Sequence, residues 1–148
     1  NPLKATKFGL PFRHVPTYLA GYYKYKAGDQ FTEGGKPVNG KRDICDIYAI
    51  MYETSESVPT LDGTNAFTSP NLISTARINN AKETNEWTYF KLPFTTLPGK
   101  FIDKEKLMDG KYNIAIVFTS SLEGDHFNGA IGSTLLIDEA ELIYHSED

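Results

Sequence analysis

Three acidic side chains stand close together near the end of the chain, in the segment LLIDEAELIY at residues 135–144. In a strand, Glu139 and Glu141 share a face because they are two residues apart, with side chains about 7 Å from each other. That separation overlaps the one used by the paired carboxylates of glycoside hydrolases. Adjacent acids on a strand also arise as a solvated face or as protection of a sheet edge. Glycoside hydrolysis is therefore one hypothesis among several.

The third acid of this segment, Asp138, is placed by alternation on the same face as two apolar residues. Leu136 and Ala140 each lie two positions away from it. A carboxylate buried on such a face must be paired, hydrogen-bonded or bound to a metal ion. We therefore weigh a bond to backbone amides, Lys or Arg against a metal site at Asp138.

Composition excludes several classes of protein. The chain has 148 residues and a formal net charge of −4, and its basic residues are scattered rather than clustered, which argues against a nucleic-acid partner. No apolar run approaches the ~20 residues of a transmembrane span. The single cysteine, Cys45, allows no internal disulfide, and its apolar surroundings predict a buried, inert thiol. The length predicts one globular domain over residues 1–148.

Short runs of aromatic and β-branched residues, separated by Gly, Pro, Asn and Asp, predict an all-β protein. Strands are expected near 3–9, 16–27, 43–54, 71–78, 87–95, 111–120 and 133–145. The one expected helical turn is IDKEKLMDG at 102–110, with Asp103 as its cap and Gly110 just past its end. This pattern is typical of a jelly-roll β-sandwich of two antiparallel sheets.

Alternation within the predicted strands separates core residues from a second face. One strand is expected to contribute four core residues: Tyr112, Ile114, Ile116 and Phe118. The second face is unusually rich in rings for a solvated sheet surface. It contains eight candidate site residues: Trp87, Tyr89, Lys91, Tyr48, Tyr52, Asp46, Tyr22 and Lys24.

Such a face can stack the apolar sides of sugars on its rings and hydrogen-bond their hydroxyl groups. The predicted function is then glycan binding without catalysis. A second hypothesis is a structural or adhesive domain whose aromatic face docks against another domain or subunit. The loops at 28–42 and 55–70 can also fold over the face. Exposed rings would favour a ligand site, whereas an enzyme would need a deep pocket with two carboxylates.

Three segments in order along the chain, PTYLAGYYKYKAG, WTYFKLPF and GAIGSTLLIDEAELIY, resemble the putative carbohydrate metabolism domain of exported Bacteroidetes proteins. The resemblance extends from Phe8 to Tyr144. It implies a jelly roll similar to carbohydrate-binding modules, at the C-terminus of a larger exported chain and following an immunoglobulin-like domain. It also implies a location in the periplasm or, as a lipoprotein, on the outer-membrane surface. It supplies no catalytic residues, so the enzyme hypothesis rests on Glu139 and Glu141 alone.

The same resemblance bears on the metal question. Carbohydrate-binding modules of this type often carry an acidic residue in an IDxxxL pattern of the last strand, where it coordinates a structural calcium ion together with backbone carbonyls. Asp138 is the one position here that matches. The resemblance therefore implies a structural calcium as the candidate cofactor, and the hydrogen-bonded alternative stays open.

Overall fold

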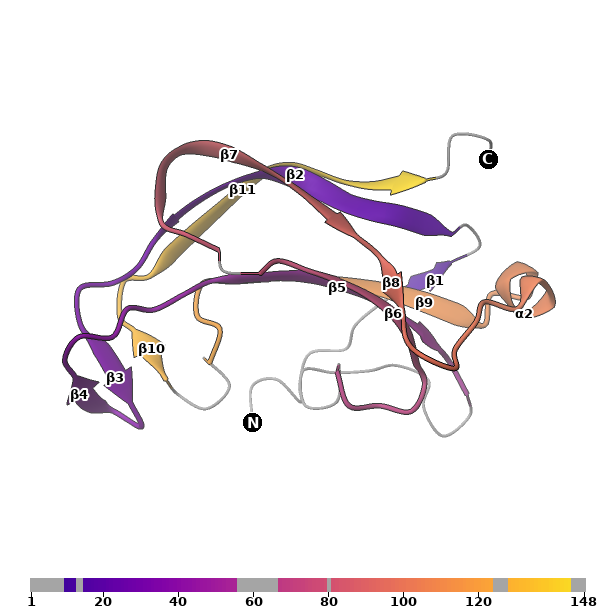
Figure 1. The fold of residues 1–148 in the computed structure, drawn as a ribbon, viewed down its shortest axis with the longest axis horizontal. Helices are drawn as coiled ribbons and strands as arrows, with labels where there is room; N and C mark the ends of the chain where they lie inside the picture. Colours follow the sequence, from indigo (N-terminus) through magenta and orange to yellow (C-terminus); the bar gives the residue numbers. More distant parts are fainter. Residues whose placement is uncertain (1–9, 13–14, 56–66, 80, 124–127, 145–148) are drawn as a thin grey trace.

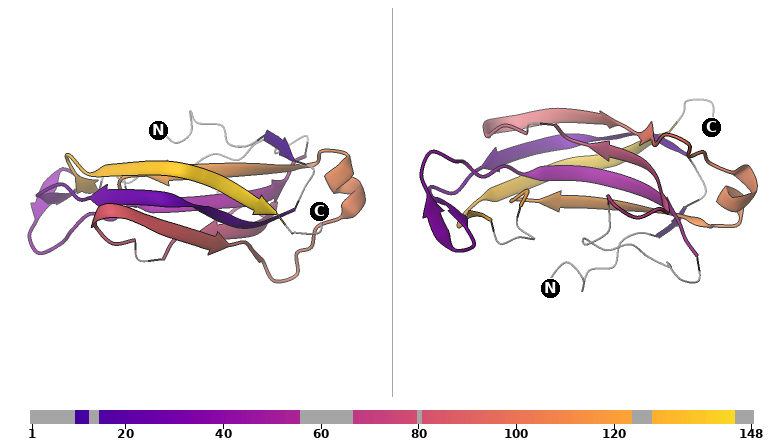
Figure 2. Two further views of the ribbon diagram at one scale, coloured as in Figure 1. Left: turned by 90° about the horizontal axis from the view of Figure 1, so that it is seen from above. Right: turned by 60° about the horizontal axis from the view of Figure 1, so that its bottom comes forward.

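The computed structural model describes residues 10–12, 15–55, 67–79, 81–123 and 128–144. These residues form two antiparallel sheets that pack face to face, with one sheet arched over the other (Figure 1). The upper sheet has the strand order β11-β2-β7, which is visible from above in Figure 2. It contains β2 (Pro16–Lys26), β7 (Thr84–Pro93) and β11 (Thr134–Tyr144). The predicted β-sandwich is thereby confirmed.

The lower sheet is wider, with the order β1-β9-β5-β6-β8. Its strands are β1 (Leu10–Phe12), β5 (Asp46–Glu53), β6 (Leu72–Arg77), β8 (Thr95–Thr96) and β9 (Tyr112–Thr119). Each long strand begins and ends within about three residues of its predicted position. The strand expected at 3–9 lies outside the described residues.

The main core lies between the two sheets. Alternate residues of β2 point downward, and Leu19, Tyr23 and Tyr25 are buried against Ile47 and Ala49 of β5. Burial of this apolar surface contributes roughly 25 cal/mol per Å² and holds the layers together. Cys45 belongs to the same cluster, as predicted, and burial raises the pKa of its thiol to about 12. The thiol is therefore protonated and unreactive at neutral pH.

Two smaller features close the ends of the sandwich (Figure 1). At one end β3 (Phe31–Glu33), β4 (Lys36–Val38) and β10 (Gly129–Ala130) form a third sheet. The turn between β3 and β4 has φ values of 57° and 85° at Gly34 and Gly35, a conformation that favours glycine. At the other end lies α2 (Lys104–Met108), whose first amides bond to the side chain of Asp103. The predicted helical turn and its cap are confirmed.

One part of the predicted core is wrong. Tyr112 and Ile114 of β9 are buried, but Ile116 and Phe118 are each more than one third exposed. By alternation all four point toward the upper sheet. The upper sheet has three strands and the lower sheet five, and no residue of β9 joins the cluster between β2 and β5. The end of β9 therefore lies beyond the cover that the upper sheet provides.

Candidate functional site

The outward side of the upper sheet carries a cluster of exposed rings. Tyr22 of β2 lies directly opposite Tyr89 of β7, and their ring centroids are 5.2 Å apart with the planes tilted by 56°. Trp87 is two residues before Tyr89 on the same strand and points to the same side. The exposed fractions are 36% for Tyr22, 45% for Trp87 and 51% for Tyr89. Three large rings are thus open to solvent on one face.

Two lysines accompany these rings. The Nζ atom of Lys24 lies 4.8 Å from the ring centroid of Trp87, and that of Lys91 lies 4.4 Å from the ring centroid of Tyr18. Within the described part of the chain, neither lysine forms an ion pair. Both ammonium groups are therefore held beside rings with donors to spare. We call the set Tyr22, Lys24, Trp87, Tyr89 and Lys91 the outer aromatic face.

A glycine and a phenylalanine fix the position of this face. Gly21 lies opposite Phe90 in the sheet, on the side that faces the core. A Cβ atom at Gly21 would come within 2.9 Å of the Phe90 ring, so that ring occupies the place of a side chain. Phe90 also packs against Tyr23, with ring centroids 6.1 Å apart. Because the inward neighbours are locked by packing, Tyr22 and Tyr89 must point outward.

The other three predicted site residues do not join the outer aromatic face. Asp46, Tyr48 and Tyr52 lie on the lower sheet, on its side away from the upper sheet, and all three are buried. The prediction of one continuous eight-residue surface is therefore wrong. Alternation correctly separated these side chains from the inward set of β5, but the two outward faces belong to opposite sides of the sandwich.

The buried trio serves packing and pairing. The Phe67 ring packs edge-on against Tyr48, with centroids 4.7 Å apart. Asp46 accepts two hydrogen bonds from the Arg77 guanidinium, at 3.1 and 2.7 Å. Arg77 in turn lies 4.2 Å from the centroid of the Phe67 ring. The loop at 55–70 was one alternative cover for the aromatic residues. Its residues 56–66 lie outside the described residues, and Phe67 covers Tyr48.

The burial expected for Asp138 is wrong. Leu135 and Ile137 are the residues of β11 that pack against the core, so the intervening Leu136 and the following Asp138 point outward and are exposed. Asp138 lies beside Tyr22 in the sheet, and its Oδ1 accepts a hydrogen bond from the amide of Glu139. Among the described residues, no group of three or more His, Cys, Asp or Glu side chains could hold a metal ion. Calcium at Asp138 stays an untested prediction.

The carboxylate pair at Glu139 and Glu141 is interrupted by a bulge. The pairing of β11 with β2 shifts between Asp138 and Glu141, and Glu139 has a positive φ of 52°. Glu141 resumes the pairing opposite Ala20. The regular alternation that would align both carboxylates on one face does not hold there. Bulges and charges on an edge strand protect it from pairing with other chains, which is a sufficient reason for these acids.

Asp43 is a second buried carboxylate besides Asp46, and the sequence reasoning missed it. Its Oδ2 accepts hydrogen bonds from the hydroxyls of Ser121 and Ser133, at 2.5 and 2.6 Å, and from the amide of Ala130 at 3.0 Å. Its Oδ1 accepts one from the amide of Ile44. These bonds tie the segment before β5 to the segment around β10. A carboxylate with four donors is satisfied and structural.

The chain belongs to the family named putative carbohydrate metabolism domain, whose model matches residues 1–143. This confirms the family resemblance found in the sequence. No match was found among curated proteins. Within the described residues, no helix has the length and apolar character needed to cross a membrane.

Two solved structures have the same fold. The crystal structure of a putative glycoside hydrolase from Bacteroides thetaiotaomicron VPI-5482 is 89% identical, with a TM-score of 0.96, and the match covers 99% of this chain and 43% of that chain. A putative glycoside hydrolase from Bacteroides vulgatus ATCC 8482 is 46% identical, with a TM-score of 0.91, covering 98% of this chain and 58% of that one. The chain therefore spans about half the length of these relatives.

Proposed function

We propose that this domain binds glycans on its outer aromatic face and performs no catalysis of its own. The observation that carries the proposal is the clustering of Tyr22, Trp87 and Tyr89 in the open on one sheet face. Removing exposed rings from water is favourable, so a cluster of them on one face marks a surface that a ligand or partner covers. Membership of a carbohydrate metabolism family makes a sugar the covering group that fits best.

The chemistry of the face suits a sugar chain. The CH groups on one side of a pyranose ring pack against an aromatic ring, and its hydroxyl groups accept hydrogen bonds from ammonium groups. Lys24 and Lys91 provide such donors close to the rings. Because Tyr22, Trp87 and Tyr89 are each more than one third exposed, this face is open rather than enclosed. An open face favours contact along a polysaccharide over capture of one small sugar.

Binding at this face is expected to be weak. Stacked rings contribute on the order of 0.5–1.5 kcal/mol each, and association itself has an entropic cost. Three rings together then contribute about 1.5–4.5 kcal/mol, which corresponds to a dissociation constant in the millimolar range or weaker. Weak modules gain affinity when they are linked to other binding or catalytic units. The relatives from Bacteroides have the additional chain length that such linkage requires.

The proposal includes the cellular setting that the family resemblance implies. We place the domain in an exported protein, in the periplasm or on the outer-membrane surface as a lipoprotein, following an immunoglobulin-like domain. Polysaccharides from outside the cell are met at these locations.

A structural calcium at Asp138 is part of the same proposal. A lower melting temperature after EDTA treatment, restored by added calcium, would support the calcium site. An unchanged melting temperature would rule it out.

Two other functions have specific support. The outer aromatic face could instead dock against another part of a longer protein, since the relatives' chains are about twice as long as this one.

Both relatives are described as putative glycoside hydrolases, which supports an enzymatic role for the whole protein. Hydrolysis by this domain itself would depend on Glu139 or Glu141. Glu139→Gln should then abolish turnover of a glycan that the unmodified domain cleaves.

The experiment that tests glycan binding compares variants on a panel of plant and host polysaccharides by affinity electrophoresis. Trp87→Ala and Tyr89→Ala should each weaken binding of the retained glycan about two- to tenfold, as expected for loss of one stacking ring. Phe101→Ala is the matched control, because Phe101 is 73% exposed but lies between β8 and α2. Equal retention of all three variants would overturn the proposal.

A further inference from the structure

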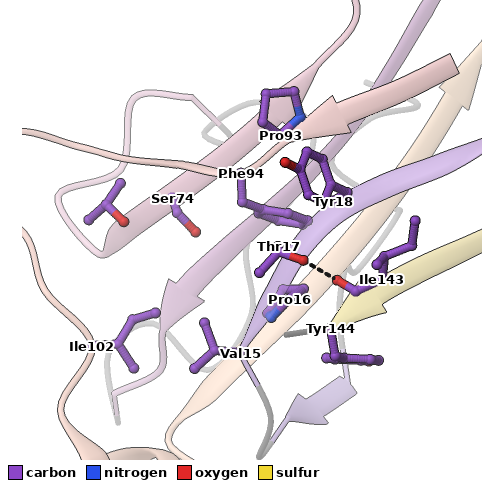
Figure 3. Close-up of a pocket in the computed structure, with 11 residues that line it drawn as sticks. Val15, Pro16, Thr17, Tyr18, Ser74, Pro93, Phe94, Ile102, Ile143 and Tyr144 are labelled. Carbon is purple, nitrogen blue, oxygen red and sulfur yellow. Dashed lines mark hydrogen bonds between the residues drawn. The ribbon is translucent and has the colours of Figure 1, made fainter. Parts of the chain in front are cut away.

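A hollow of about 530 Å³ opens at the end of the sandwich near α2 (Figure 3). It lies where β2 begins, where β7 and β11 end, and where β6 and β8 pair. Val15, Phe94, Ile102 and Ile143 provide apolar walls around it. Its volume falls within the range of about 300–1,000 Å³ that is usual for small-molecule sites. None of the described residues that line it carries a charge.

Two hydroxyl groups stand side by side in this hollow. Ser74 of β6 and Thr96 of β8 are direct partners in the sheet, so their side chains share a face about 5 Å apart. Ser74 is only 3% exposed, yet its hydroxyl has no hydrogen-bond partner among the described residues. No fully buried side-chain oxygen in the described residues lacks a partner, so the Ser74 hydroxyl must open onto the hollow. In Figure 3 it points into the space bounded by Phe94, Thr17 and Ile102.

The Ser74 hydroxyl opens onto the hollow without a partner among the described residues, so it can hydrogen-bond to a ligand there. We propose that the hollow is a second binding site, separate from the outer aromatic face, for an uncharged ligand that carries hydroxyl groups and an apolar side. A single sugar unit with an aryl or alkyl group is such a ligand. Adjacent hydroxyls of the sugar bond to Ser74 and Thr96, and the apolar group contacts Phe94 and Ile102. An ion is disfavoured because no charged side chain compensates it there.

Amide chemical shifts test the site with phenyl β-D-glucopyranoside as the probe. Titration of the ¹⁵N-labelled domain to tens of millimolar should shift the amides of Thr17, Ser74 and Thr96 together, with one saturation curve. Ser74→Ala should weaken this binding about two- to tenfold, the range for one net hydrogen bond. A spectrum without shifts at these amides would overturn the site, as would equal binding by the Ser74→Ala protein.

A blocking variant separates the hollow from other surfaces. Thr96→Trp places a large ring in the mouth of the hollow and should abolish the shifts. Thr95→Trp is the matched control, since Thr95 is exposed on the opposite face of the same short strand and should leave them intact. Shifts that persist in Thr96→Trp would contradict the proposal. Trp87→Ala should leave the shifts unchanged, so loss of glycan binding at the outer aromatic face does not bear on this test.

Discussion

The outward faces of the two sheets differ sharply although the same residue types build them. On the upper sheet, Tyr22 and Tyr89 remain exposed and Lys24 and Lys91 have no anionic partner among the described residues. On the lower sheet, the rings are buried and the acidic side chain of Asp46 is paired with Arg77. The outward face of the upper sheet is exposed, whereas that of the lower sheet forms part of a second hydrophobic core.

The difference shows what alternation in a strand determines. It groups residues by face, but whether that face meets solvent depends on segments far away in the sequence. Tyr48 is covered by Phe67, and the cluster of Tyr48, Ile50 and Tyr52 is completed by Leu97, which follows β8. Among the described residues, no segment covers Trp87 in this way, and its ring is 45% exposed. Substitution of a buried ring should therefore destabilise the fold far more than substitution of an exposed ring.

The largest expected effect is on the stability contributed by the buried rings. Tyr52 is fully buried, so Tyr52→Ala should lower the free energy of unfolding by about 3–5 kcal/mol through lost burial and a cavity. Tyr89→Ala removes an exposed ring and should cost about 0.5 kcal/mol. Urea denaturation of both variants measures the contrast. Similar losses in the two variants would show that the outward faces are not different in kind.

The two aspartates give the next contrast. Asp43→Asn replaces a buried carboxylate that has four donors, and should lower the free energy of unfolding by about 2–4 kcal/mol. Asp138→Asn changes an exposed side chain and should shift it by less than about 0.5 kcal/mol. Thermal unfolding in calcium-free buffer checks both. A large loss in the Asp138 variant would instead indicate that this residue has a structural partner.

These aspartates also show how far the sequence could be read. The positions of the long strands β2, β5, β6, β7, β9 and β11, the cap at Asp103 and the burial of Cys45 follow from local patterns and were predicted correctly. The burial of Asp138 was inferred from Leu136 and Ala140 as an apolar pair. Leu135 and Ile137 form an equally good pair, and packing against the core selected them. In a run of consecutive apolar residues, the pattern alone does not determine which of the two alternating sets faces the core.

The same reasoning predicted only part of the candidate site correctly. Trp87, Tyr89 and Lys91 were assigned to one outward face, and their grouping with Tyr22 and Lys24 follows the observed pairing of β2 with β7. Their separation from Tyr48 and Tyr52 required knowledge of which strands share a sheet. Asp43 could have been noticed because it precedes a buried strand, but its partners Ser121 and Ser133 are about 80 to 90 residues away. Long-range pairs of this kind leave no local signal.

The thiol of Cys45 reports on the core that both sheets share. Because burial raises its pKa to about 12 and excludes reagents, a disulfide reagent at pH 8 should modify it only when the protein unfolds. Tyr52→Ala should then accelerate the reaction roughly a hundredfold or more, in line with its loss of stability. Tyr89→Ala should leave the rate within a few fold. Rapid modification of the unsubstituted protein would contradict the buried position.

The smallest expected effect concerns a surface ion pair at the margin of the upper sheet. Hydrogen bonds from Arg42 and from the amide of Ala27 lower the pKa of Glu83 below its ordinary value. A depressed carboxyl pKa stabilises the fold above the unfolded-state pKa, and this contribution is lost as the pH falls through the folded-state value. Arg42→Gln should raise the pKa of Glu83 in an NMR titration. An unchanged value would show that the pair does not persist in solution.

The central claim is that the outer aromatic face binds a glycan, and the single tryptophan of the chain lies in that face. The most direct measurement is a titration of the domain with plant and host polysaccharides while Trp87 emission is followed. We expect a saturable blue shift or quench for one glycan class, and in Tyr22→Ala or Tyr89→Ala the same response should need about two- to tenfold more glycan because one stacking ring is missing. Binding of a glycan that leaves Trp87 emission unchanged, or no binding across the panel, would contradict the claim.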